Sequence, residues 1–426
     1  MDTANRRPTY RLYPTPAQEQ ALTAQLEAHR LLYNAALEQR RAAWSRQRVT
    51  LSYADQCRDL TPLRQSEDCP LPAQAAQSTL KRVQLAFEAF FRRLKAGQTP
   101  GYPRFKSRRR FHGWTYPTHG DGWRLLPREG MQHGRVRLAG VGHVRMRGDA
   151  RTLGTPKTCT IVCRHGKWYA SVVIACQPVR SHGTETMAFD WGVETFATLA
   201  SLEETPQPVA NPRFFGASEA KLQAAYRARD RKRKCSHGWR LANRRVAQIH
   251  STIARQRLDF HHKQAAAMID SATVVITEQL QTANMSRRPK PKPDESTGQF
   301  LPNGAASKAG LNKAILDSAP TQFLGILRYK AAEAGVVYVE APTRALKPSQ
   351  RCHACWTVAP KPLHQRWHIC ACGASCGRDE NSARVLLVWG VRHILSVFLA
   401  TLWLRQWSQE LAPGLGLQNL PREPKA

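Results

Sequence analysis

The sequence predicts an α/β domain with a zinc ribbon as an insert, preceded by a β-barrel-like part and a helical part. Apolar residues recur at helical spacing in residues 15–46 and 72–95, whereas residues 134–177 alternate in the manner of strands. After residue 187, short apolar runs alternate with long helical stretches, as in α/β domains. Two close cysteine pairs follow within residues 352–372.

The first part of the chain reads as a short strand followed by helices. Residues 8–13 are strand-like and end at Pro14. Leu22, Leu26, Tyr33 and Leu37 then recur at four- and seven-residue steps, which predicts a helix to about residue 46. The stripe of apolar and aromatic residues in 72–95 predicts a second helix that packs in a helical core.

A basic loop and a β region follow. Arg104, Lys106 and Arg108 lie close to Tyr102 and Phe105, a composition suited to phosphate and base contacts. A basic hinge is the alternative interpretation. Residues 134–177 predict an antiparallel meander or a small barrel, because Gly and His-Gly turns separate the alternating segments.

The second half predicts the α/β domain. Residues 187–200 read as two buried strands joined by a tight turn, and residues 274–278 and 336–340 as further strands. A basic helical stretch spans about 215–268, and a helix is expected over about 312–334. Residues 286–310 are rich in Pro, Lys, Ser and Gly and read as a linker or lid. Within the basic stretch, we favour nucleic-acid contact by Arg231, Arg233 and Arg257 over a solvated helix face.

The cysteine cluster has the spacing of a zinc ribbon. Cys352 and Cys355 form the first pair, and Cys370 and Cys372 form the second. These four thiols are the predicted zinc ligands, and Cys376 in place of Cys370 is the alternative. Free buried thiols are disfavoured at this density. His353, His364 and His368 are expected on the ribbon surface or facing nucleic acid.

The net charge restricts the partners. The chain has 64 Lys and Arg against 31 Asp and Glu, a formal net charge of +33. A field of that sign favours a polyanion, and the interleaved aromatic residues favour nucleic acid over a membrane surface. The most apolar run, residues 394–404, is too short to span a bilayer. Clustered cysteines and the absence of a signal-like N-terminus predict a reducing cytosol.

Three carboxylates share one context. Asp190 and Glu278 lie at ends of apolar runs, and Asp379 directly follows the ribbon. Hydrolysis of a phosphodiester by two hard ions such as Mg²⁺ needs carboxylates that converge from separate elements. A single Asp at a strand end is usually a cap or turn residue, so the set of three carries the prediction.

The order of these motifs resembles the TnpB proteins of insertion sequences and, through them, the small type V CRISPR effectors. The resemblance covers about residues 8–388. Its motifs are Arg11-Leu-Tyr-Pro-Thr, Gly101-Tyr-Pro-Arg-Phe-Lys, Asp190-x-Gly192, Arg257-x-Asp-Phe-His-His-Lys263, Ile276-Thr-Glu278-x-Leu280, the cysteine ribbon and Arg378-Asp379-x-Asn381.

The resemblance implies a RuvC-like nuclease domain of RNase H fold over residues 183–348 and 377–404. Asp190, Glu278 and Asp379 would be its catalytic acids and would hold two Mg²⁺ ions. It further implies a WED-type β-barrel (1–14 and 111–182), a helical REC domain (15–110), a zinc-ribbon insert that contacts target nucleic acid (349–376) and a C-terminal tail (405–426). The zinc would be structural. The partners would be a guide RNA and a target double-stranded DNA cut beside a short adjacent motif.

Several positions depart from the pattern of that family. Trp191 follows Asp190 where a small residue is commoner, Trp356 replaces a Gly after Cys355, and Gly377 replaces an acid before Arg378. The substitutions beside Asp190 and Asp379 therefore keep a cleavage-deficient RNA-guided repressor as an alternative. A compact CRISPR effector with the same chemistry is a further alternative, which only the genomic neighbourhood would distinguish. An unguided DNA-binding protein is the weakest one. A monomer is the favoured oligomeric state, and the apolar helix after residue 388 is expected to pack on the nuclease domain.

Overall fold

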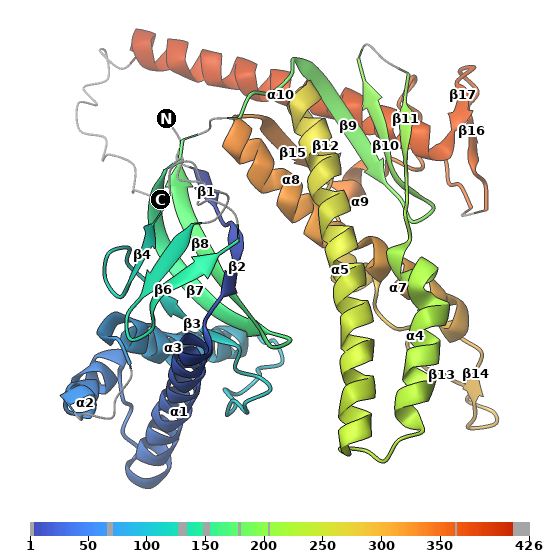
Figure 1. Ribbon diagram of the computed structural model, residues 1–426. Coiled ribbons are helices and arrows are strands. Elements are labelled where there is room, and N and C mark those ends of the chain that lie inside the picture. Colours follow the sequence, from blue (N-terminus) through green and yellow to red (C-terminus); the bar gives the residue numbers. More distant parts are fainter. Residues whose placement is uncertain are drawn as a thin grey trace. The chain divides into compact units, whose positions relative to one another are not determined.

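The computed structural model describes residues 4–65, 71–126, 134–147, 154–177, 180–202, 205–362 and 364–411. The chain divides into two units, residues 1–178 and 179–426 (Figure 1). Each unit has its own hydrophobic cores.

The first unit contains a nearly closed, barrel-like antiparallel sheet (Figure 1). Its core strands alternate buried and exposed residues, as the sequence predicts, and the buried face carries Trp114, Trp123, Trp168 and their neighbours. Strands β3 and β4 precede the range 134–177 in which alternation predicted strands, and lie within the range 111–182 implied by the resemblance; each has only four residues, too few for a clear alternation. The sheet order is β3-β7-β8-β2-β6-β5-β4, with β1 beside β8. The strands are β1 (Ala4–Arg6), β2 (Thr9–Tyr13), β3 (Gly113–Tyr116), β4 (Trp123–Leu126), β5 (Arg135–Leu138), β6 (Gly142–Met146), β7 (Thr155–Arg164) and β8 (Lys167–Cys176).

Three helices complete this unit. Helix α1 (Pro16–Gln47) starts at a capping box in which Thr15 and Gln18 satisfy each other's backbone N–H groups. Helix α3 (Ala73–Lys95) packs on it around Tyr33, Leu37 and Leu80. Both helices were predicted. Helix α2 (Tyr53–Gln65) was not, because its polar sequence and internal Pro62 hide the helical periodicity.

The second unit is built on a five-stranded mixed sheet of order β11-β10-β9-β12-β15. Strands β9, β12 and β15 are parallel to one another, and β10 and β11 are antiparallel to their neighbours. Alternation along β9 sends Met187 and Phe189 to one face and Ala188 to the other. The strands are β9 (Glu185–Trp191), β10 (Thr195–Ser201), β11 (Gln207–Ala210), β12 (Ala272–Glu278) and β15 (Val337–Ala341).

Helices cover both faces of this sheet. Helices α5 (His237–Ser271) and α8 (Pro320–Ala334) pack on the face that carries Phe189. Helix α10 (Arg378–Leu411) packs on the other face, where it approaches β12 closely. A Cβ atom at Gly390 would lie 2.3 Å from Ile276 Cδ1, so only glycine fits there as the core is packed.

Two stretches that were each predicted as one helix contain two helices in the structure. The basic stretch 215–268 divides into α4 (Phe214–Asp230) and α5, because Ser236 caps the start of α5 by accepting a hydrogen bond from Trp239 N. The stretch 312–334 divides into α7 (Ala305–Ser318) and α8. Ala319 has φ 46° between them, and Pro320 begins the second helix. The predicted linker 286–310 is correspondingly shorter and contains the pairing of β13 (Lys292–Pro293) with β14 (Phe300–Leu301).

The ribbon and the C-terminal helix complete the unit. Short elements α6 (Thr282–Met285) and α9 (Thr343–Leu346) follow the ends of β12 and β15. Strands β16 (Trp367–Ile369) and β17 (Ser375–Gly377) form the ribbon hairpin, and α10 starts at the next residue. The apolar segment after residue 388 is thus the continuation of α10, with Trp389 and Val391 against the core. Residues 412–426 of the predicted tail lie outside the described residues. Within the described ranges, no helix is both long and apolar enough to cross a membrane.

Candidate functional site

The three predicted acids come together at one edge of the five-stranded sheet. Asp190 lies near the end of β9, and Glu278 is the last residue of β12. These strands are parallel, and their register pairs Ala188 with Ile276, so the two acids two residues further on lie side by side. Asp379 is in the first turn of α10, which packs on β9. The charges of Glu278 and Asp379 both act on Asp190.

This edge is an unfavourable place for three negative charges. Burial raises the pKa of Asp190 well above its usual value, and the hydrogen-bonded neighbour Glu278 and the charge of Asp379 raise it further. Arg378 opposes this effect. Burial also raises the pKa of Glu278, whose side chain is 8% exposed. The buried group of acids therefore favours a proton more than free carboxylates do, and a divalent cation would compete with that proton.

A cavity opens beside Glu278. It has a volume of about 520 Å³ and is lined by Trp191, the segment after β12 and the start of α9. Trp191, the unusual residue after Asp190, is 7% exposed and packs in the wall of this cavity. The indole of Trp191 therefore forms part of the cavity wall without closing the cavity beside Glu278.

The four predicted thiols also come together. The sulfur atoms of Cys352, Cys355, Cys370 and Cys372 all lie within 4.8 Å of one another. Cys352 Sγ is 3.7 Å from Cys372 Sγ, and Cys355 Sγ is 3.5 Å from Cys370 Sγ. Tetrahedral bonds of about 2.3 Å to a single Zn²⁺ place sulfurs about 3.8 Å apart. The four thiols thus fit one metal ion.

The fifth thiol lies outside the group of four, but two histidines lie close to that group. His353 and His368 each have a ring nitrogen within 4.8 Å of Cys352 Sγ, so these three residues form a second, overlapping set of possible metal ligands. Cys376 is buried in β17 opposite His368 and is not in the group of four. His368 is also buried, at 2% exposed, so its predicted place on the ribbon surface is wrong. His353 is half-buried and contacts Asn381, whereas His364 is exposed as predicted.

Trp356 explains a departure from the family pattern. It has φ 67°, in the left-handed region that favours glycine, which is the residue expected after Cys355. The indole lies between two guanidinium groups, with Arg351 Cζ 5.1 Å and Arg392 Cζ 4.9 Å from its ring. These cation–π contacts offset the strained backbone.

Two residues that sequence reasoning gave no role join the ribbon to the acids. Asn381, fully buried in the first turn of α10, donates to Arg351 O at 2.7 Å and accepts from His353 N at 3.1 Å. Arg378 donates to Pro362 O at 2.8 Å, and its backbone N–H bonds Arg366 O. Arg378, directly before Asp379, and Asn381, two residues after it, are therefore both hydrogen-bonded to the ribbon. The motif Arg378-Asp379-x-Asn381 contained this signal.

The basic residues predicted to contact nucleic acid differ in their exposure and in whether they form ion pairs. Arg104, Arg231 and Arg233 are exposed, the last two in the turn between α4 and α5. Arg108 is exposed but pairs with Glu27 at 3.2 Å. Lys106 is half-buried, and its backbone exchanges hydrogen bonds with Asn34. Arg257 lies in α5 and pairs with Asp317 at 3.3 Å.

Known protein families match three segments of the chain. Residues 170–288 match the family described as "Probable transposase" of the IS605 OrfB type, and residues 1–48 match its "Helix-turn-helix domain". In the structure, residues 4–48 form two strands and one long helix. Residues 321–386, which include the thiols and Asp379, match the "Cas12f1-like, TNB domain".

Two relatives match three quarters or more of the chain. A protein of Streptomyces pristinaespiralis named "Putative RNA-guided DNA endonuclease" is 30% identical over 90% of this chain and 88% of its own length. The "Putative RNA-guided DNA endonuclease InsQ" of Escherichia coli K12 is 30% identical over 75% of each chain. The fold is similar to the protein in a Cas12f1-sgRNA-target DNA complex, with a TM-score of 0.56 and 10% identity over 90% of this chain and 99% of that one. The chain belongs to the TnpB family.

Proposed function

We propose that this protein is an RNA-guided DNA endonuclease that cleaves target DNA next to a short adjacent motif, as part of a transposable element. One observation carries the proposal: Asp190, Glu278 and Asp379 converge from three separate elements into a partly buried group of like charges. The names of the two relatives support the same activity.

The proposed site is RuvC-type and takes two Mg²⁺ ions. The donors are carboxylate oxygens, which hard cations prefer, and their raised pKa values indicate a site that a cation would stabilise. Bound there, the ions would supply an activated water and neutralise charge on the leaving oxygen. Asp190 and Glu278 are held by the parallel strands, so their carboxylates need little reorganisation to bind. The cavity beside Glu278 would admit the scissile phosphate.

The ribbon is proposed to hold a structural zinc ion. Four thiolates fill a tetrahedral site and leave no position open for a substrate. Through Asn381 and Arg378, the folded ribbon would fix the turn that presents Asp379. This insert corresponds to residues 349–376, between the parts of the nuclease domain at 183–348 and 377–404. The barrel-like sheet and α1–α3 would be the WED-type and REC domains.

The proposed partners are a guide RNA and a double-stranded target DNA. The charge of +33 suits two polyanions, and binding by many phosphate contacts should weaken steeply with salt. Exposed Arg104, Arg231 and Arg233 are proposed contacts in both units. The place of action would be the cytosol, on chromosomal DNA.

The test is to express the protein with its native locus and sequence the RNA that co-purifies. Cleavage of a DNA that matches this RNA is then assayed with Mg²⁺ and with EDTA. We expect a defined RNA and Mg²⁺-dependent cutting that Asp190→Ala abolishes. Guided binding without cutting would identify a repressor instead, and the absence of a specific RNA would refute guidance altogether.

A further inference from the structure

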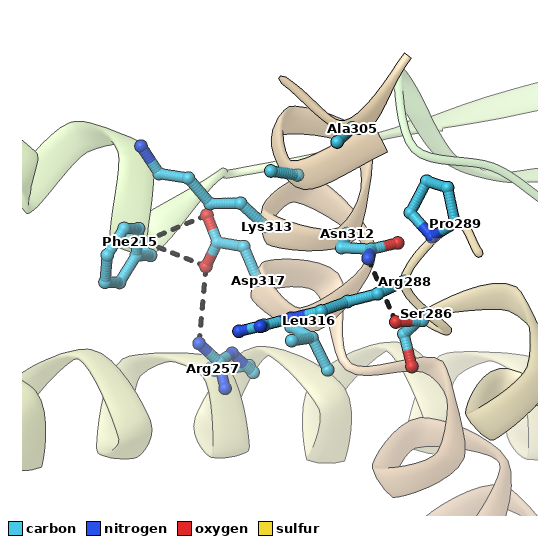
Figure 2. Close-up of a pocket in the computed structure, with 11 residues that line it drawn as sticks. Phe215, Arg257, Ser286, Arg288, Pro289, Ala305, Asn312, Lys313, Leu316 and Asp317 are labelled. Carbon is cyan, nitrogen blue, oxygen red and sulfur yellow. Dashed lines mark hydrogen bonds and ion pairs between the residues drawn. The ribbon is translucent and has the colours of Figure 1, made fainter. Parts of the chain in front are cut away.

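A second cavity in the nuclease unit lies apart from the three acids. It has a volume of about 730 Å³ and is bounded by α5, α7, the start of α4 and residues 286–289 (Figure 2). None of its lining residues lines the cavity beside Glu278. Its size is in the range of small-ligand sites, roughly 300–1,000 Å³.

The wall of this cavity is fixed by a buried carboxylate. Asp317 accepts hydrogen bonds from Phe215 N at 2.9 Å and Gly216 N at 3.2 Å, and so caps the start of α4. It also accepts a bond from Arg257 at 3.3 Å (Figure 2). Because these donors occupy Asp317, its charge holds α4, α5 and α7 together and leaves little acceptor capacity for a ligand.

Two polar atoms of the wall lack partners within the described residues. Arg257 uses one terminal nitrogen on Asp317, while its Nε is buried and has no hydrogen-bond partner. Asn312 donates through Nδ2 to Ser286 O at 2.9 Å, which leaves its buried Oδ1 without a donor. One unmatched cationic donor and one unmatched acceptor thus line the same cavity. A ligand with an anionic group and an N–H edge would satisfy both.

Charge favours an anion here. Three cationic side chains line the cavity, Arg257, Arg288 and Lys313, against the single carboxylate of Asp317. In the described part of the chain, the exposed Arg288 has no ion-pair partner, and Figure 2 shows its side chain extending toward Arg257 and Asp317. Lys313 pairs with Glu219. Two guanidinium groups in this arrangement suit the oxygens of a phosphate.

The remaining wall is apolar. Phe215, Leu316 and Pro289 contribute side chains, and Ala305 and Ala309 keep the α7 side open. The Phe215 ring already has Lys313 Nζ 5.4 Å from its centre. A planar heterocycle could lie against these residues, which is how single-stranded nucleic acids gain binding energy from aromatic side chains.

We propose that this cavity binds one unpaired nucleotide. Its phosphate would be held by Arg257 and Arg288, its base would lie against Phe215 and Leu316, and an N–H on the base edge would donate to Asn312 Oδ1. The inference rests on the proposed function, because the nucleotide would belong to an unpaired position of the guide RNA or of a displaced DNA strand.

Two variants and two matched controls test the cavity. Arg288→Gln removes a phosphate contact, and Arg287→Gln removes the same charge from the adjacent exposed residue outside the cavity. Ala309→Phe fills the cavity, and Ala306→Phe adds the same ring elsewhere on α7. Binding of the full-length chain to labelled single-stranded tetranucleotides of RNA and of DNA is measured by fluorescence anisotropy with no Mg²⁺ added.

We expect Arg288→Gln to weaken binding about tenfold, the value of one charge-assisted hydrogen bond, and the controls to weaken it less than twofold. Ala309→Phe should weaken binding by about as much, because its ring occupies the space of the nucleotide. A loss confined to RNA or to DNA identifies the strand. Equal losses for Arg287→Gln and Arg288→Gln, or unchanged binding by Ala309→Phe, would overturn the proposal. Guided cleavage of matched DNA is measured in parallel, so a failure of the cavity is distinguished from a failure of the nuclease.

Discussion

The four-thiol cluster and the three-carboxylate cluster each gather ligands of one kind, but they are built in opposite ways. The thiols come from one continuous segment, residues 352–372, and a hairpin brings them together. The carboxylates come from β9, β12 and α10, far apart in the sequence, and require the parallel sheet. A local site can therefore be deduced from spacing, whereas an assembled site depends on the fold around it.

The two clusters also differ in how they hold protons. The hydrogen bond with Thr357 is the main cause that lowers the pKa of the exposed Cys355 to about 6. A backbone hydrogen bond from Cys372 lowers the pKa of the adjacent Cys370, but side-chain hydrogen bonds with Cys355 and Cys372 outweigh it and raise that pKa to about 11, so the thiols share their protons unequally. Asp190 has its pKa raised by burial and by Glu278. A cation at the carboxylates would therefore compete with a proton at Asp190, whereas in the ribbon at least one thiol already releases its proton readily.

The largest effect is expected from removing one acid. Glu278→Gln keeps the side-chain shape but removes a proposed metal ligand, and should reduce the cleavage rate by roughly 10³-fold or more, as loss of a preorganised charged group does. The control is Glu340→Gln on the adjacent strand, where Glu340 pairs with Thr277 in the register. Single-turnover cleavage measures both. Equal losses would show that the charge of the sheet edge, and not the site, matters.

Breaking the ribbon should affect both clusters. Cys352→Ser with Cys355→Ser removes half of the thiols, so bound zinc should fall to background and cleavage should be lost with it, because metal binding stabilises the folded ribbon. Metal content by emission spectroscopy and cleavage are the measurements. Cys376→Ser, outside the group, should keep its zinc. Full zinc in the double variant would refute the ligand set.

The hydrogen bonds of Asn381 that link the ribbon to the first turn of α10 can be removed without replacing any thiol or carboxylate of the two clusters. Asn381→Ala removes the bonds to Arg351 and His353 and should lower cleavage about 10- to 100-fold while zinc is retained, as for other residues that orient metal ligands. A smaller loss with Asn381→Asp, which keeps the acceptor for His353, would support positioning. Unchanged cleavage by Asn381→Ala would disconnect the ribbon from Asp379.

The smallest effect concerns pH. Above the usual pKa of Asp190, 3.8, the unfolded chain releases a proton that the folded chain keeps, so the unfolding free energy falls as pH rises toward the raised pKa. Its slope from this group is at most about 1.4 kcal/mol per pH unit. Thermal melting of wild type and Asp190→Asn without added Mg²⁺ should therefore diverge with rising pH, the variant becoming relatively more stable. Added Mg²⁺ should narrow the gap by stabilising the wild type.

Much of this architecture could be predicted from the sequence. The helices at 16–47 and 73–95, the strands that carry Asp190 and Glu278, and the thiol group all follow from periodicity and spacing. The division at Ser236 and at Ala319 could not be seen as easily, because helical composition continues on both sides of a short interruption. Helix α2 was not predicted, because its polar sequence shows no apolar periodicity.

The residues of the candidate site could be predicted from the sequence, but the strand register and the hydrogen bonds that position them could not. The register that sets Asp190 beside Glu278 is a property of the sheet, and no local pattern encodes it. Asn381 at a helix start reads as an ordinary polar residue until its partners 28 and 30 residues earlier are known. The cavity at Asp317 joins segments from four parts of the chain, so composition could indicate only its basic character.

The contact between Gly390 and Ile276 has a consequence for how this family member can change. About three turns of α10 separate Asp379 from Gly390, so both residues lie on the same side of that helix. With no side chain at Gly390, the helix sits against β12 at a fixed height and rotation. A bulkier residue at Gly390 would rotate α10 or move it away from β12, and would thereby displace Asp379 from Glu278. The geometry of the candidate site therefore depends on a core residue that is none of its proposed ligands, and a substitution at Gly390 would change the positions of the acids proposed to hold the ions.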